Sequence, residues 1–223
     1  MSVVQLHEPR VASEAPSFAV SAAREGTASN AYAQSDSLSA GAFITRNLAD
    51  VVHHFTLLHG RHPGMVDHAA SHTVDPATRD WLHQASDGFA RERAWLSRLT
   101  SAIGPIPSTT GQAASEAAVL AQRHALDMLA QSDRRGCAFG AVAALVCDWA
   151  AVRILLERAA LRVGIDPIAC NLPSPEATAS VVADFAGTPA LERALGFGSD
   201  QLLTQHRGLW DLLHARQLAR GHG

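Results

Sequence analysis

Residues 137–152, CAFGAVAALVCDWAAV, are the most apolar stretch of the chain, and they decide its fold. The stretch holds a single charged residue, Asp148, and Arg153 follows directly after it. It is shorter than the ~20 apolar residues that a helix needs to cross a membrane. We therefore expect no membrane span here, but a helix that lies buried at the centre of the protein.

Amphipathic helices are expected along most of the remaining chain, because apolar residues recur at steps of three and four. Gly, Pro and capping residues set the bounds of these helices. The expected helices cover residues 38–58, 65–72, 76–103, 112–131, 133–163, 176–186, 188–195 and 199–219, with a break at Gly196-Phe197-Gly198. Short links favour antiparallel neighbours, so the sequence predicts an all-α fold, mainly an antiparallel bundle of about four long helices plus short C-terminal helices.

The N-terminal segment differs from the rest in composition. Residues 1–36 are rich in Ala and Ser, contain Pro9 and Pro16, and hold few large apolar side chains. Such a segment buries too little apolar surface to offset the entropy of ordering, so we predict a disordered tail. Residues 37–223 are then a single helical-bundle domain, because Ala, Leu and Val dominate and β-forming residues are sparse.

Charge and motifs exclude several classes of function. The formal net charge is −3, and all 18 basic residues are Arg without forming a basic run, so no nucleic-acid partner is expected. Three cysteines without a CxxC pair, and an N-terminus without a signal sequence, favour the cytoplasm. GxSxG, Walker and GxGxxG motifs are missing, so the sequence leaves open whether the protein is an enzyme.

Six of the 12 histidines lie within residues 53–72, HHFTLLHGRHPGMVDHAASH. Neutral imidazole binds transition metals such as Zn or Fe, and histidines four residues apart share one face of a helix. The candidate metal ligands are His59, His62, Asp67, His68 and His72. The alternative interpretation is a polar connection whose histidines cap helix ends or face water, and the sequence favours this alternative over the metal site.

A second candidate site is a buried polar layer around Asp148. A buried carboxylate must be paired, hydrogen-bonded or protonated. If consecutive helices are antiparallel, the layer contains Glu92, Glu116, His124 and Asp148. His124 belongs to an expected core stripe made of Ala113, Ala117, Leu120, Ala121, His124 and Met128. Such a layer can hold a di-metal centre, but the Glu-x-x-His motif is missing, so a structural network that pairs Asp148 with Arg123 or Arg153 is favoured.

Small residues recur every four positions at Gly136, Gly140 and Ala144. This pattern lets a neighbouring helix approach closely. A flat face of this kind also admits a planar cofactor such as haem, but close packing is the favoured interpretation. Three classes of function remain open: a helical bundle that binds a small molecule or a metal, an interaction protein with an exposed patch near Trp210 and Leu213, and a homo-oligomer that packs through this small-residue face.

Overall fold

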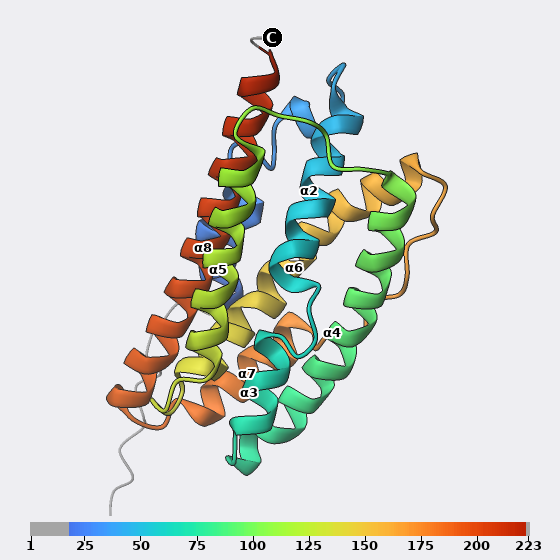
Figure 1. Cartoon of the computed structure of the whole chain (residues 1–223). Coiled ribbons are helices and arrows are strands. Elements are labelled where there is room, and N and C mark those ends of the chain that lie inside the picture. The colour runs from blue at the N-terminus through green and yellow to red at the C-terminus, as the bar shows by residue number, and fades with distance from the viewer. Residues whose placement is uncertain (1–17, 222–223) are drawn as a thin grey trace, which may run out of the picture.

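The computed structural model describes residues 18–221 of the chain. Over this range it contains eight α-helices, two short 3-10 helices and no strand, which confirms the predicted all-α fold (Figure 1). The α-helices are α1 (Phe18–Glu25), α2 (Ile44–His59), α3 (Met65–His72), α4 (Pro76–Ile103), α5 (Gln112–Ala130), α6 (Cys137–Arg162), α7 (Pro175–Phe185) and α8 (Pro189–Gly221). The 3-10 helices are η1 (Thr27–Ser29) and η2 (Asp36–Leu38).

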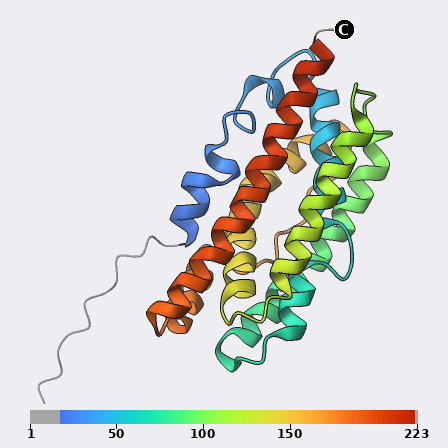
Figure 2. The same cartoon turned by 60° about the vertical axis from the view of Figure 1, so that its left-hand side comes forward.

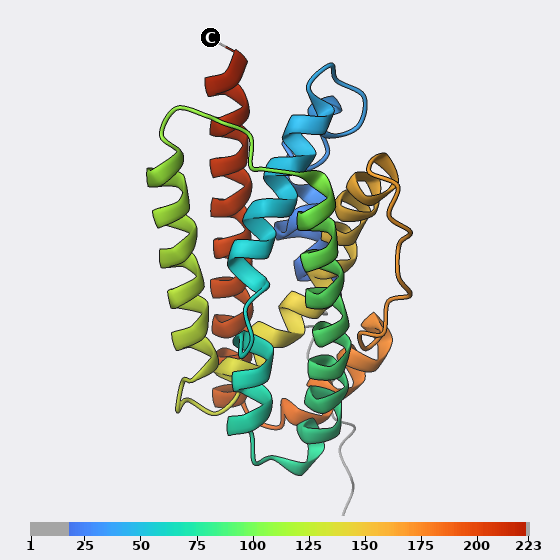
Figure 3. The ribbon, with the colours of Figure 1, turned by 45° about the vertical axis from the view of Figure 1, so that its right-hand side comes forward.

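Helix α6 is the central element of the fold. It contacts every other long helix, and it crosses the middle of the molecule at an angle (Figure 3). Among the described helices, α6 alone is long and apolar enough to span a membrane by length and composition. However, 78% of its most apolar window is buried inside the protein. This burial is what the sequence predicted for a central core helix.

The long helices are antiparallel in part of the molecule only. Helix α4 runs toward one end, residues 104–111 cross over that end, and α5 runs back in the opposite direction, with α2 between α4 and α5 (Figures 1 and 3). After α6, residues 163–174 lead back along the outside of the bundle to α7, so α8 starts near the end at which α6 starts. Helices α6 and α8 therefore run in the same general direction. The expected antiparallel arrangement depended on short links, and this link is long.

Helix α8 is a single helix of 33 residues, so the break predicted at residues 196–198 is wrong. Gly198 and Gly140 are instead the points at which α8 crosses α6. A Cβ atom at Gly198 would lie 2.0 Å from the carbonyl oxygen of Cys137, and one at Gly140 would lie 2.2 Å from the carbonyl oxygen of Leu195. The small-residue face of α6 is therefore used for close packing within the chain, as the sequence favoured, and is closed to haem or to a second copy.

The predicted disordered tail is wrong for residues 18–36, while residues 1–17 lie outside the described residues. Helix α1, η1 and η2 pack on the bundle, and Ala22, Thr27, Tyr32 and Ala33 are buried. Figure 2 shows α1 against one side of α8, with α5 on the other side. Composition missed this packing because much of the attachment is polar. The backbone N–H and the hydroxyl of Thr27 both donate to Asp148 inside the core.

The stripe of α5 that was expected in the core faces outward. Leu120 is 40% exposed, Met128 is 58% exposed and His124 is also exposed. The buried positions of α5 are Val119, Leu126 and Ala130. Alanine occurs on both sides of this helix, so apolar periodicity alone could not identify the buried side.

The crossing of α6 and α8 predicts opposite effects of two alanine substitutions. Gly198→Ala is expected to lower the free energy of unfolding by about 1–3 kcal/mol, because the new methyl group would collide with the backbone of α6. Gly196→Ala is the matched control, since nothing lies within 4 Å of its Cβ position. It is expected to raise the free energy of unfolding by about 0.5–1 kcal/mol through helix propensity. Urea denaturation measures both, and equal stabilities would contradict the close crossing.

Candidate functional site

A chain of buried polar groups passes through the centre of the bundle, and we call it the histidine relay (Thr27, Asp148, His206 and His59). The backbone N–H of Thr27 donates to Oδ1 of Asp148, and its hydroxyl donates to Oδ2, both at 2.7 Å. Nδ1 of His206 lies 2.6 Å from Oδ2 of Asp148. Nε2 of His206 lies 2.9 Å from Nε2 of His59. The relay therefore joins η1, α6, α8 and the last residue of α2.

The two facing Nε2 atoms can share only one proton in a hydrogen bond. When both imidazoles are neutral, His206 donates from Nδ1 to Asp148 and accepts at Nε2. His59 then donates from Nε2, and its Nδ1 carries no proton. Burial lowers the pKa of His59 well below its ordinary value, and the nearby His206 and Arg93 lower it further, so His59 is neutral at pH 7. Among residues 18–221, the one hydrogen bond of the His59 side chain is made by Nε2, which leaves Nδ1 as the open end of the relay.

Aromatic side chains surround the two histidines. The ring of Phe55 lies 5.8 Å from the ring of His206, and the rings of Trp149 and Phe89 lie 5.6 Å and 6.1 Å from the ring of His59, measured between centroids. This packing keeps water away from the relay. A low local dielectric strengthens each hydrogen bond in the network and makes an unpaired polar group more costly.

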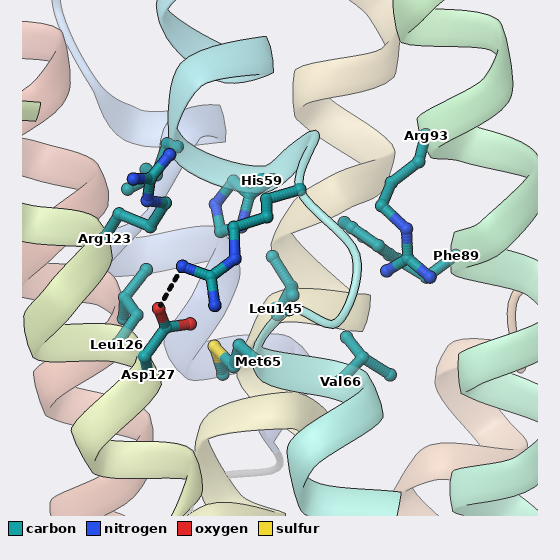
Figure 4. A pocket seen from close by; sticks show the side chains of 12 residues that line it. His59, Met65, Val66, Phe89, Arg93, Arg123, Leu126, Asp127 and Leu145 are labelled. Carbon is teal, nitrogen blue, oxygen red and sulfur yellow. Dashed lines mark ion pairs between the residues drawn. The ribbon is translucent and has the colours of Figure 1, made fainter. Parts of the chain in front are cut away.

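His59 lines a small cavity between α2, α3, α4, α5 and α6 (Figure 4). The cavity has a volume of about 10 Å³, which is enough for one water molecule. Its wall includes His59, three arginines (Arg61, Arg93 and Arg123) and one carboxylate, Asp127. The wall therefore carries more positive than negative charge.

The three arginines differ in how firmly they are held. Arg93 is buried, and its guanidinium nitrogens lie 3.0 Å from both carboxylate oxygens of Asp67. Arg61 has a half-exposed side chain whose Nη1 lies 3.8 Å from Asp127, a long ion pair drawn in Figure 4. Arg123 donates to the carbonyl oxygen of Leu57 at 3.4 Å. Arg61 and Arg123 therefore have guanidinium groups that a ligand can recruit without breaking a strong ion pair.

Asp67 is committed to structural contacts. It accepts hydrogen bonds from the backbone N–H of Gly64 at 2.8 Å and from the hydroxyl of Ser86 at 2.9 Å, in addition to Arg93. Burial alone would raise the pKa of Asp67, but the Gly64 hydrogen bond and the charge of Arg93 lower it below its ordinary value. Nδ1 of His62, a largely exposed residue, lies 3.3 Å from the same carboxylate. Asp67 thus anchors the connection between α2 and α3 to α4.

The five candidate metal ligands do not converge on one point. His59 lies in the core, His62 is exposed, and Asp67 is taken by Arg93. Nδ1 of His72 bonds to the carbonyl oxygen of His68 at 2.8 Å, at the surface. Among residues 18–221, no group of three or more His, Cys, Asp or Glu side chains is placed to hold a metal ion. Of the five, only His59 belongs to the relay.

The expected polar layer is divided in the same way. Glu92 and Asp148 are buried, Glu116 is half-buried, and His124 is exposed. Asp148 pairs with His206 and Thr27, not with Arg123 or Arg153. The expected pairing failed because it compared consecutive helices, whereas the partners of Asp148 come from η1 and α8.

Arg153 pairs with Glu92 in a second buried network. The guanidinium of Arg153 donates to Glu92 and, at 2.6 Å, to the carbonyl oxygen of Ile168, and Nε1 of Trp149 donates to Glu92 at 2.9 Å. Burial raises the pKa of Glu92, although both donors act in the opposite direction. This network ties α4, α6 and the connection 163–174 together, and neither charged member lines the cavity.

Sequence reasoning missed His206 and Thr27. A signal for His206 was present, because it lies in the apolar stripe of residues 202–213, where a histidine is as unexpected as an aspartate in α6. No comparable signal marks Thr27, which lies in a segment without apolar period. Its role depends on a contact with a residue 121 positions away in the chain.

Thr27 offers a test of the buried network that leaves side-chain shape unchanged. Its hydroxyl donates to Asp148 and accepts from Nε1 of Trp210 at 2.9 Å, so Thr27→Val leaves the Trp210 N–H unsatisfied. We expect the free energy of unfolding to fall by about 1–3 kcal/mol. Thr178→Val is the matched control, since that buried hydroxyl shares the Ser174 carbonyl oxygen with a backbone N–H. A loss in Thr27→Val no larger than in Thr178→Val would show that the hydroxyl does not support the network.

The comparison with protein families covers almost the whole described range. Residues 22–221 match a family of unknown function, DUF6975. No curated protein and no solved structure matches the chain. The matched range contains every residue of the histidine relay and of the cavity wall. The chain therefore belongs to the DUF6975 family.

Proposed function

We propose that this protein binds a small anionic ligand at the cavity beside His59. One observation supports the proposal. His59 is the end of the buried histidine relay, and it lines a cavity whose wall also contains three arginines. His59 ends α2 and Arg61 follows two residues later, so the histidine-rich segment 53–72 contributes to the proposed site without forming a metal centre.

The chemistry of the wall favours an oxyanion such as a carboxylate or a phosphate. Guanidinium groups bind these anions through charge-assisted, often bidentate, hydrogen bonds. Within residues 18–221, Arg123 donates to a carbonyl oxygen and to no carboxylate, and Arg61 holds Asp127 loosely, so an anion can take the place of Asp127. Nδ1 of His59 carries no proton in the neutral relay, so it donates to an oxyanion only once the imidazole has gained a proton there. The cavity of about 10 Å³ has room for one water molecule, so an anion of a few atoms enters only when the half-exposed Arg61 moves outward and widens the site.

A cation is disfavoured at the same place. A transition metal beside His59 would lie close to three guanidinium groups that repel it. In addition, Nε2 of His59 is already hydrogen-bonded to His206, so only one imidazole nitrogen is open as a ligand. These two features favour an anion over the metal that the histidine-rich segment suggested.

Anion binding is tested by isothermal titration calorimetry with formate, acetate and inorganic phosphate. We expect at least one of these anions to bind, and Arg123→Met to weaken its binding about tenfold or more, as loss of a charge-assisted hydrogen bond does. Arg162→Met is the matched control, because Arg162 is exposed at the end of α6 and does not line the cavity. The proposal fails if none of the three anions binds at millimolar concentration, or if both variants lose affinity equally.

A second candidate function is self-association through α5. The interaction surface expected near Trp210 and Leu213 does not exist, because both residues are fully buried. A group of exposed apolar residues lies instead on α5 and the adjacent part of α8. Its exposed residues are Ala113, Ala117, Leu120, Ala121, His124, Met128 and Phe197.

This α5 surface suits a second copy of the chain. Its own residues include no Asp, Glu or Arg, although the guanidinium of Arg134 lies over the ring of Phe197, and beside it lies an open groove of about 260 Å³ lined by Met128 and Phe197 among others. Two copies related by a two-fold axis would present the same uncharged face to each other. Nineteen residues of helix extend about 28 Å, so α5 alone makes an interface at the small, weak end of the observed range.

Self-association is measured by sedimentation equilibrium between micromolar and submillimolar concentration. We expect a weak monomer–dimer equilibrium that the double change Leu120→Glu and Met128→Glu abolishes, because it buries four carboxylates in the dimer. Ile154→Glu is the control, since Ile154 is as exposed as Met128 but lies on α6. A monomer at every concentration would rule out this function without affecting anion binding.

A further inference from the structure

We infer that anion binding at the cavity is coupled to the uptake of one proton by the histidine relay, so that the protein binds an anion and a proton together. This inference rests on the anion-binding function proposed above. It follows from the geometry of the relay. The imidazoles of His59 and His206 share one proton, His206 contacts the carboxylate of Asp148, and His59 lines the arginine-rich cavity.

The charged groups around His59 come from every element packed against it. They are Arg61 of the connection after α2, Arg93 of α4 with its partner Asp67 of α3, Arg123 and Asp127 of α5, Asp148 of α6 and His206 of α8. On the cavity side these groups are mainly cationic. On the inner side, the carboxylate of Asp148 lies one imidazole away from His59.

In the empty site, the cavity opposes a further positive charge. Burial lowers the pKa of His59, and Arg93 lowers it as well, so the relay keeps His59 neutral. An anion bound among the arginines compensates part of their charge. Protonation of the relay then becomes more favourable, because an opposite charge nearby stabilises the protonated imidazole.

The relay gives the added proton a defined route. A proton from solution binds Nδ1 of His59, which then donates to the anion. The shared proton moves from Nε2 of His59 to Nε2 of His206. His206 becomes an imidazolium that donates at both nitrogens, to His59 and to Asp148 at 2.6 Å. The charge thus ends beside the carboxylate rather than beside the arginines, and no hydrogen bond of the relay is lost.

This route assigns separate roles to the members of the relay. His59 touches the ligand, and its Nδ1 changes from acceptor to donor as the proton arrives. His206 and Asp148 are positioning residues that accept the charge and stabilise it. Thr27 keeps Asp148 in place through two hydrogen bonds. Because binding and protonation are linked, the affinity for the anion must rise as pH falls.

Calorimetry with formate measures the coupling directly. The titration is run at pH 7 in Tris, Bis-Tris and imidazole, which are cationic buffers with different enthalpies of ionisation. We expect the binding enthalpy to vary linearly with the buffer enthalpy, with a slope of one proton taken up for each formate bound. We also expect the affinity to increase about tenfold for each pH unit between pH 8 and pH 6, as linkage to one proton requires.

Two variants identify the proton acceptor. His206→Gln keeps a hydrogen-bonding side chain but cannot take the charge, so formate should bind with little proton uptake. His62→Gln is the control, since His62 is an exposed histidine beside Arg93 that does not line the cavity, and proton uptake should be unchanged. If His206→Gln does not fold, the 15N shifts of His59 and His206 in the wild-type protein should report the imidazolium on addition of formate.

The outcomes separate this inference from the proposed function. Formate binding with a buffer-independent enthalpy overturns the coupling and leaves the anion site intact. Proton uptake that disappears in His62→Gln, or imidazole shifts of His59 and His206 that do not change with formate, also overturn it. If formate fails to bind while another anion binds, the same measurements are made with acetate. Failure of all anions to bind overturns both the inference and the function on which it rests.

Discussion

The carboxylate of Asp148 is the point on which the rest of the structure depends. It lies in the most apolar helix of the chain, and it accepts hydrogen bonds from the backbone and side chain of Thr27 and from His206. A charge buried without such partners would cost several kcal/mol. The neighbouring Gly26 follows from the same constraint, because a Cβ atom there would lie 2.2 Å from Oδ1 of Asp148. Asp148 therefore holds the N-terminal segment and α8 against α6.

Two other buried carboxylates follow the same principle. Glu92 is paired with Arg153, and Asp50 is paired with Arg216 and Arg220 near the C-terminal end of α8. Each pair joins helices that are distant in sequence. Buried ion pairs contribute little net stability compared with apolar packing, but a missing partner is costly. In a core made largely of Ala, Leu and Val, these pairs specify which helix faces meet. Asp148 differs from the other two because its partner is a histidine, which can gain and lose a proton near neutral pH.

The histidine partner of Asp148 is the feature from which the proposed function of the relay follows. An arginine partner of Asp148 would keep its charge at every physiological pH. His206 instead links Asp148 to His59, because the facing Nε2 atoms of the two histidines share one proton. The cavity beside His59 is the place where the interior of the bundle meets polar groups at the surface. Burial lowers the pKa of His59, and the nearby His206 and Arg93 lower it further. The proposed anion site and its coupling to protons are thus two consequences of one arrangement of charges.

Local signals were sufficient to locate most of the helices. Helices α3 and α4 begin and end at the expected residues, because Gly, Pro and Asp-Pro signals are read within a few positions of the chain. The same local reading failed at Gly198, where glycine reflects contact with another helix, and on α5, where alanine on both sides removed the apolar contrast. Of the candidate site residues, Glu92 and Asp148 are buried, and the burial of Asp148 was expected because it interrupts the most apolar stretch of the chain.

The sequence by itself determined the all-α class, the burial of α6 and the need for partners of Asp148, since these depend on local composition and periodicity. Only the tertiary structure decided which partners those are. Thr27 and His206 lie 121 and 58 residues away from Asp148, and His59 lies 147 residues away from His206. No helical period relates positions at such separations. The histidine-rich segment therefore contributed one histidine to the relay, and the crossing of α8 over α6 supplied the histidine that completes it.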